Sequence, residues 1–236
     1  MSLNLNAATQ KKDNGRVDDG SYSARIVQVI DLGVQHDTMW VNGASQKQFY
    51  VVDDAGKTVT NDDGYAKKTG NDTGHPVMTP KVQATFEFPT ERIDIGGESK
   101  PRWLSKEYNV TSSGALAKLV EMLAPGSTNI GDILNKPCMV AIGSTSGGKA
   151  KIVSVSLPMK GMEVPELENP AILFDFDNPD KATWDNMLQW IKDKIKESSN
   201  YEGSALQEMV VGHPQIPMPS EGSVDNTPID SNDVPY

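Results

Sequence analysis

Several features that would place this chain in a familiar class are missing from its sequence. Cys138 is the single cysteine in 236 residues, which excludes a disulfide within the chain and a zinc site built on cysteines. No apolar run reaches the roughly 20 residues of a membrane-spanning helix, and residues 1–6 lack the basic and apolar regions of a secretory signal. We therefore expect a protein of a reducing cytoplasm, without membrane contact and with Cys138 buried in the apolar run 138–142.

Positive charge is absent after Lys196. Residues 197–236 hold seven of the 32 acids and no lysine or arginine, so residues 1–196 carry 25 acids against all 22 bases. The net charge of −10 therefore divides into −3 for the body and −7 for the C-terminal segment. A body this close to neutral can still carry a basic groove, because the local field rather than the total charge sets the affinity for phosphate.

Motifs for catalysis and for metal binding are also missing. The three histidines, His36, His75 and His213, have no second ligand at metal spacing. Residues 143–149 match most of a phosphate-binding loop, but Ala150 stands where the metal-binding hydroxyl belongs and a strand is expected to follow instead of a helix. We expect a hairpin loop there, and no catalytic residue, metal or cofactor in the chain.

Alternating apolar residues and β-branched side chains predict a series of strands in the body of the chain. The expected strands cover about residues 21–32, 47–53, 81–88, 137–142 and 150–157, with another extended piece at 100–111. Between the second and third strands, residues 54–79 are expected to form a long loop rich in Gly, Asp, Asn and Lys.

The segment 81–88 alternates most regularly. Its expected buried face holds Val82, Ala84, Phe86 and Phe88, and its expected outer face holds Lys81, Gln83, Thr85 and Glu87. Pro89 is expected to end this strand.

Two helices are predicted. In the first, Leu116, Leu119, Val120 and Leu123 follow helical spacing, Ser112 or Ser113 is the expected cap, and Pro125-Gly126 is the expected stop. The second follows the Asx and proline residues at 175–180 and places Trp184 on its buried stripe.

The order of these elements is typical of one small β architecture. A helix between the third and fourth strands of a mainly β chain resembles the OB-fold, a five-stranded Greek-key barrel. We expect this barrel and its C-terminal helix in residues 20–200, after a flexible arm at 1–19 and before a disordered tail at 201–236. Another small β-barrel and a β-sandwich are the alternatives.

Basic and aromatic residues alternate closely in the body. Binding of single strands without sequence preference needs cations that follow the phosphates and flat rings that stack on bases. We expect Arg102, Trp103 and Lys106 to share one groove. The candidate DNA-binding residues are Lys47, Tyr50, Lys81, Arg92, Arg102, Trp103, Lys106, Tyr108, Lys149 and Lys151.

The acidic C-terminal segment ends in a short apolar motif. Its residues Asp230, Asp233, Val234, Pro235 and Tyr236 resemble the tip of single-stranded DNA-binding proteins of the bacterial and phage type. The chain departs from that pattern in having Ser231-Asn232 within the acidic run and Tyr rather than Phe at the end. The resemblance continues in the segments 106–111, 136–140, 148–150 and 169–201.

The resemblance implies a protein that binds and protects single-stranded DNA during phage replication, recombination and repair, in the cytoplasm of an infected bacterium. It also implies that the C-terminal tip recruits replication and recombination proteins. A protein–protein adaptor with the same barrel, or a metal-free hydrolase using unassigned carboxylates, is the alternative. Whether the chain forms an oligomer is left open by the sequence.

Overall fold

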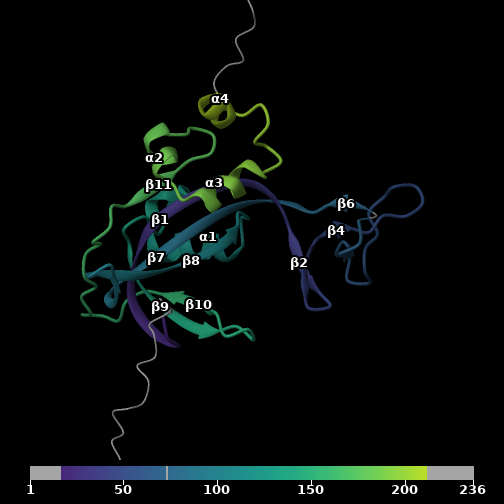
Figure 1. Ribbon diagram of the computed structural model, residues 1–236. Coiled ribbons are helices and arrows are strands. Elements are labelled where there is room, and N and C mark those ends of the chain that lie inside the picture. The colour runs from purple at the N-terminus through teal and green to yellow at the C-terminus, as the bar shows by residue number, and fades with distance from the viewer. Residues whose placement is uncertain (1–16, 73, 212–236) are drawn as a thin grey trace, which may run out of the picture.

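The computed structural model describes residues 17–72 and 74–211, and in this part of the chain strands predominate over helices (Figure 1). The strands are β1 (Gly20–His36), β2 (Thr38–Val41), β3 (Ala44–Lys47), β4 (Phe49–Tyr50), β5 (Lys68–Thr69), β6 (His75–Pro76), β7 (Met78–Ile95), β8 (Glu98–Asn109), β9 (Pro137–Ser144), β10 (Ala150–Ser156) and β11 (Ile172–Phe174). The helices are α1 (Ala115–Leu123), the 3₁₀ helix η2 (Ile130–Ile133), α2 (Lys181–Asn186), α3 (Gln189–Lys196) and α4 (Ala205–Val211). The predicted mainly β fold is confirmed.

The long strand β1 organises the main sheet, whose order is β10-β9-β1-β7-β8 with all neighbours antiparallel. Its first residues pair with β9 and the rest with β7, while β11 adds a short parallel pairing at 28–30. Two register shifts bend it, one between Ile26 and Gln28 and one between Asp31 and Val34. Gly33 lies in the second bend with φ +70, and a Cβ there would be 2.7 Å from Oδ1 of Asn200, so the bend requires glycine.

The first hydrophobic core lies between the main sheet and α1. The alternating side chains of β7 enter it as predicted, since Ala84, Phe86 and Phe88 are fully buried. The predicted apolar stripe of α1 packs against them. Burial of each large apolar side chain stabilises the fold by about 1.5–3 kcal/mol. Cys138 is buried in the same core, as expected.

A second core lies on the C-terminal side of β1, where β11, α2, α3 and α4 pack (Figure 1). Ile30 and Leu32 of β1 meet Phe174 and Trp184 there, which confirms Trp184 as a core residue. The single helix predicted here is wrong. Extended backbone at Met187 and Leu188 divides it into α2 and α3, and the cap is Asp180, whose carboxylate accepts a hydrogen bond from the Thr183 N–H.

An arm of short strands, residues 38–77, separates β1 from β7 and extends away from the main sheet (Figure 1). It contains the β2–β3 hairpin and the three-stranded sheet β5-β4-β6. The predicted strand at 47–53 is interrupted, since Lys47 ends β3, Phe49–Tyr50 form β4 and Val52 makes an isolated bridge with Thr58. The predicted long loop at 54–79 instead includes β5, β6 and the start of β7.

Three further expectations fail for local reasons. Strand β7 continues beyond Pro89 because a register shift between Phe88 and Arg92 bypasses the missing proline N–H. Helix α1 begins after Gly114 without a side-chain cap, so neither Ser112 nor Ser113 caps it. Among the described residues, no strand pairing joins β8 to β10, so closure of the predicted five-stranded Greek-key barrel is not found.

The chain ends lie partly outside the described residues. Val17, within the predicted arm 1–19, is buried in the first core. Sequence reasoning missed α4, which lies in the predicted tail 201–236 and buries Leu206 completely. None of the helices in the described ranges has both the length and the hydropathy of a membrane crossing.

Tyr108 should make the fold sensitive to alkaline pH. Burial, with a smaller contribution from Cys138, raises the pKa of its phenol from 10.0 to about 12. The unfolded chain then releases this proton first. The phenol therefore leaves the free energy of unfolding unchanged below pH 10 and lowers it as the pH rises towards 12. We expect Tyr108→Phe to remove a loss of about 1.4 kcal/mol per pH unit in that window, measured by urea unfolding. The exposed Tyr65→Phe should leave the pH dependence unchanged, and an equal slope in Tyr108→Phe and wild type would contradict this assignment.

Candidate nucleic-acid interface

Strand β8 divides the predicted groove residues between two faces of the sheet. Leu104 and Tyr108 contact the first core, so the even-numbered side chains of this strand, including Arg102 and Lys106, belong to that face. Trp103 lies on the opposite face, next to α3. The expected groove shared by Arg102, Trp103 and Lys106 is therefore wrong, because adjacent residues of a strand point in opposite directions.

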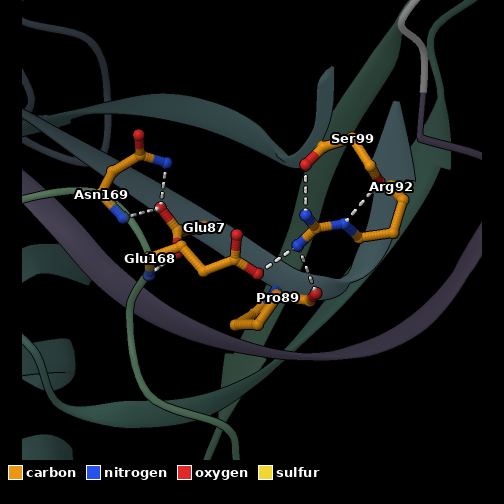
Figure 2. Close-up of polar contacts among 6 residues, drawn as sticks. All are labelled: Glu87, Pro89, Arg92, Ser99, Glu168 and Asn169. Atoms are coloured by element: carbon orange, nitrogen blue, oxygen red, sulfur yellow. Dashed lines mark hydrogen bonds and ion pairs between the residues drawn. The ribbon is translucent and has the colours of Figure 1, made fainter. Parts of the chain in front are cut away.

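Most of the predicted DNA-binding cations in the main sheet have partners within the chain. Lys81 forms an ion pair of 2.8 Å with Asp37, and both side chains are largely buried. Arg92 pairs with Glu168 and donates to backbone oxygens (Figure 2). Arg102 and Lys106 also donate hydrogen bonds to backbone oxygens.

Arg102 Nε donates to the Arg92 carbonyl oxygen at 3.0 Å, and Lys106 Nζ donates to the Ile152 carbonyl oxygen at 3.3 Å. The Lys106 bond joins β8 to β10, where the sheet is open. In the structure, these cations therefore form contacts within the chain that stabilise the fold.

The aromatic residues predicted to contact DNA also lie in different parts of the structure. Tyr108 lies in the first core with 5% of its surface exposed. Tyr50 and Lys47 lie in the arm, and Lys68 Nζ is 5.5 Å from the centroid of the Tyr50 ring. Only Trp103, of the predicted rings on β8, presents a large exposed surface, 51%.

The β9–β10 hairpin carries the remaining predicted cations, Lys149 and Lys151, and both are exposed. Its turn is closed by hydrogen bonds from Thr145 N–H to Lys149 O and from Gly148 N–H to Thr145 O, which confirms the predicted hairpin. Residues 133–162 contain four lysines and no Asp or Glu. The hairpin therefore lies in a segment whose lysines are not accompanied by any acidic residue.

The outer face of β7 is buried, which the sequence analysis did not foresee. Gln83, Thr85 and Glu87 are 2%, 2% and 0% exposed. The segment that precedes β11 covers Glu87, whose carboxylate accepts hydrogen bonds from the N–H groups of Glu168 and Asn169 at 2.8 and 3.3 Å and from the Asn169 side chain at 2.5 Å (Figure 2). The apolar stripe of the C-terminal helices was the available signal, because such a stripe must cover some face of the sheet.

A pocket of about 320 Å³ remains between this buried polar face and α3. We name it the Trp103–Trp190 pocket after the two half-exposed tryptophans that line it. Its other lining residues are Val27, Gln28, Gln83, Thr85, Glu87, Ser105, Asn169, Pro170, Ile172, Asn186, Leu188 and Ile191. Trp190 was not among the predicted site residues, although its place off the apolar stripe of its helix was a signal that its ring is exposed.

Other hollows border α1. One of about 810 Å³ is an apolar groove in which Glu121 is the one lining carboxylate. Another of about 220 Å³ lies between Lys106, Tyr108 and β10. Neither of these hollows supplies the carboxylate pair that the hydrolase alternative requires, and no group of three metal-binding side chains occurs in the part of the chain that the structure describes. The predicted partner-binding residues Asp230, Asp233, Val234, Pro235 and Tyr236 lie outside that part.

Glu87→Gln tests whether the buried carboxylate holds the segment before β11 in place. An amide presents an N–H₂ group where one carboxylate oxygen accepted hydrogen bonds, and an unsatisfied buried group costs about 1–3 kcal/mol. We expect the free energy of unfolding to fall by about that amount in urea denaturation. Glu163→Gln, an exposed carboxylate of the preceding loop, is the matched control. Equal stability of the two variants would show that Glu87 has no such role.

Comparison with protein-family models, with curated proteins and with solved structures found no match to this chain.

Proposed function

We propose that the protein binds single-stranded DNA without strong sequence preference and without catalysing a reaction, and that it serves DNA replication, recombination and repair. The observation that carries the proposal is the exposed, acid-free β9–β10 hairpin at the end of a sheet whose strand order matches that of an oligonucleotide-binding barrel.

The strand order supports an open form of the OB-fold. Numbered along the chain, β1, β7, β8, β9 and β10 lie in the order 5-4-1-2-3, and α1 follows the third strand. An OB barrel has this order, and it binds oligonucleotides on the face of strands two and three and with the loops between strands one and two and between four and five. The corresponding elements here are β7 with β8, the arm 38–77, and the turn 145–149.

The charge distribution supports phosphate contacts at the hairpin. Lys149 and Lys151 are exposed, and neither has an ion pair among the described residues. A phosphate backbone can therefore approach them without breaking an ion pair, although the Asp19 carboxylate lies at the base of the hairpin, where it accepts a hydrogen bond from Ser144 Oγ at 2.7 Å. Cations in such positions supply most of the affinity in binding without sequence preference.

Lys149→Gln combined with Lys151→Gln tests the phosphate contacts. Each lost contact lowers the slope of log K against log salt by about 0.7 for single strands, so the double variant should lose about 1.4. Its affinity for a dT oligonucleotide at low salt should fall about ten-fold. Fluorescence anisotropy at several salt concentrations, with wild type, the double variant and a duplex oligonucleotide, measures both quantities.

The matched control neutralises two lysines on the C-terminal helices, Lys181→Gln and Lys196→Gln, which changes the net charge equally. Its salt slope should equal that of wild type. Equal slopes in all three proteins would reject the hairpin as the phosphate site, and absence of binding by wild type would reject the function.

The acidic C-terminal segment completes the proposal. The four carboxylates of residues 221–236 would compete with DNA for the cationic surface and, once DNA has bound, this segment would recruit replication and recombination proteins. A chain without residues 221–236 should bind single-stranded DNA more tightly at low salt, and this difference should vanish near 1 M salt, where the screening length is about 3 Å. The truncated chain should also lose capture of replication proteins in pull-down experiments.

A full-length control with Asp225, Asp230 and Asp233 changed to Asn should reproduce the tighter binding, because it removes charge without shortening the chain. Equal affinity of all three proteins at low salt would reject the competition.

The apolar groove beside α1 favours one alternative, a protein–protein adaptor. The groove is lined by the apolar side chains of Val110, Leu116, Val120, Met122 and Ile130. Apolar hollows of this size are common binding sites for segments of partner proteins. The adaptor function requires no oligonucleotide binding, so the titration above separates the two.

A further inference from the structure

The Trp103–Trp190 pocket combines two flat apolar walls with one buried polar group that has no partner. Trp103 comes from β8 and Trp190 from α3, and they are 51% and 48% exposed. Half-exposed tryptophans that share one hollow offer ring faces to a ligand, because an indole buries a large apolar area when a second ring covers it.

The sheet side of the pocket carries the polar groups. Thr85 is already paired with Gln28 at 3.2 Å and with Ser105 at 2.9 Å, and Glu87 receives the hydrogen bonds described above. Gln83 is 2% exposed, and its Nε2 atom has no hydrogen-bond partner in the structure. A buried amide donor of this kind needs an acceptor, and a ligand that brings a carbonyl oxygen would supply it.

The charge of the pocket excludes phosphate as its ligand. Among the described residues that line it there is no lysine or arginine, and Glu87 contributes the single charged group. Its volume of about 320 Å³ is at the lower end for small-molecule sites, which fits one small group rather than a large ligand. These features fit a small, flat, uncharged ligand with a carbonyl group.

We propose that this pocket takes a single unpaired base of the bound strand, with thymine preferred over adenine. The base stacks against the tryptophans, and one of its carbonyl oxygens accepts a hydrogen bond from Gln83 Nε2. Adenine carries no carbonyl group, so it gains the stacking without that bond. This inference rests on the proposed function, and it assigns base contacts to a different face from the phosphate contacts of Lys149 and Lys151.

Three variants of the full chain test the pocket, with 20-mers of dT and of dA as probes in anisotropy titrations at two salt concentrations. Gln83→Met keeps the side-chain length and removes the donor, so dT binding should weaken about five-fold and dA binding should stay unchanged. Trp103→Ala and Trp190→Ala should each weaken both oligonucleotides about ten-fold or more. The salt slope should equal that of wild type in all three, because no phosphate contact is lost.

Val211→Ala is the control, because Val211 is 71% exposed at the end of α4 and lies outside the pocket and the proposed DNA-contacting elements. It should keep the wild-type ratio of dT to dA affinity. Thermal unfolding checks that each variant folds, and Trp103→Phe and Trp190→Phe, which keep a ring, should restore most of the binding.

Wild-type affinities and ratios in the three pocket variants would overturn the base pocket, while a loss of salt slope in the Lys149 and Lys151 variant would leave DNA binding in place. If wild type bound neither oligonucleotide, both proposals would fall.

Discussion

Strand β1 must bury side chains towards two different cores, and the rest of the structure depends on how it does so. Ile26 and Val29 enter the core under α1, and Ile30 and Leu32 enter the core formed with the C-terminal helices. A regular strand would send alternate residues to opposite faces along its whole length. The two register shifts bend β1 so that one strand serves β7, β9 and β11 as a partner.

The second core determines what happens to the outer face of the sheet. Once α3 and the segment before β11 pack there, the polar residues of β7 lose contact with water. Glu87 and Thr85 find partners within the chain, whereas Gln83 Nε2 does not. Strand β7, whose sequence predicts one exposed face, is therefore buried on both faces. Its polar residues Gln83, Thr85 and Glu87 form the inner wall of a pocket.

The predicted DNA-binding cations of the main sheet fall into two groups with different roles. Lys81, Arg92, Arg102 and Lys106 bind carboxylates or backbone oxygens inside the molecule, so they stabilise the sheet. The lysines of the β9–β10 hairpin face solvent in a segment without acids. In the proposed function, phosphates and bases are consequently contacted by different elements, and salt and base identity should affect binding separately.

The sequence by itself determined the local elements that follow from periodicity. The alternation at Val82 to Phe88, the helical stripe from Leu116 to Leu123, the hairpin before Lys149 and the buried Trp184 all follow from spacing that any packed chain must satisfy. The tertiary structure alone decided which sides of the sheet are covered. Trp103 and Arg102 are neighbours in sequence but lie on opposite faces, whereas Trp103 and Trp190, which are far apart in sequence, line one pocket. Pairing across such distances depends on where α3 packs against β8, and no local pattern carries that information.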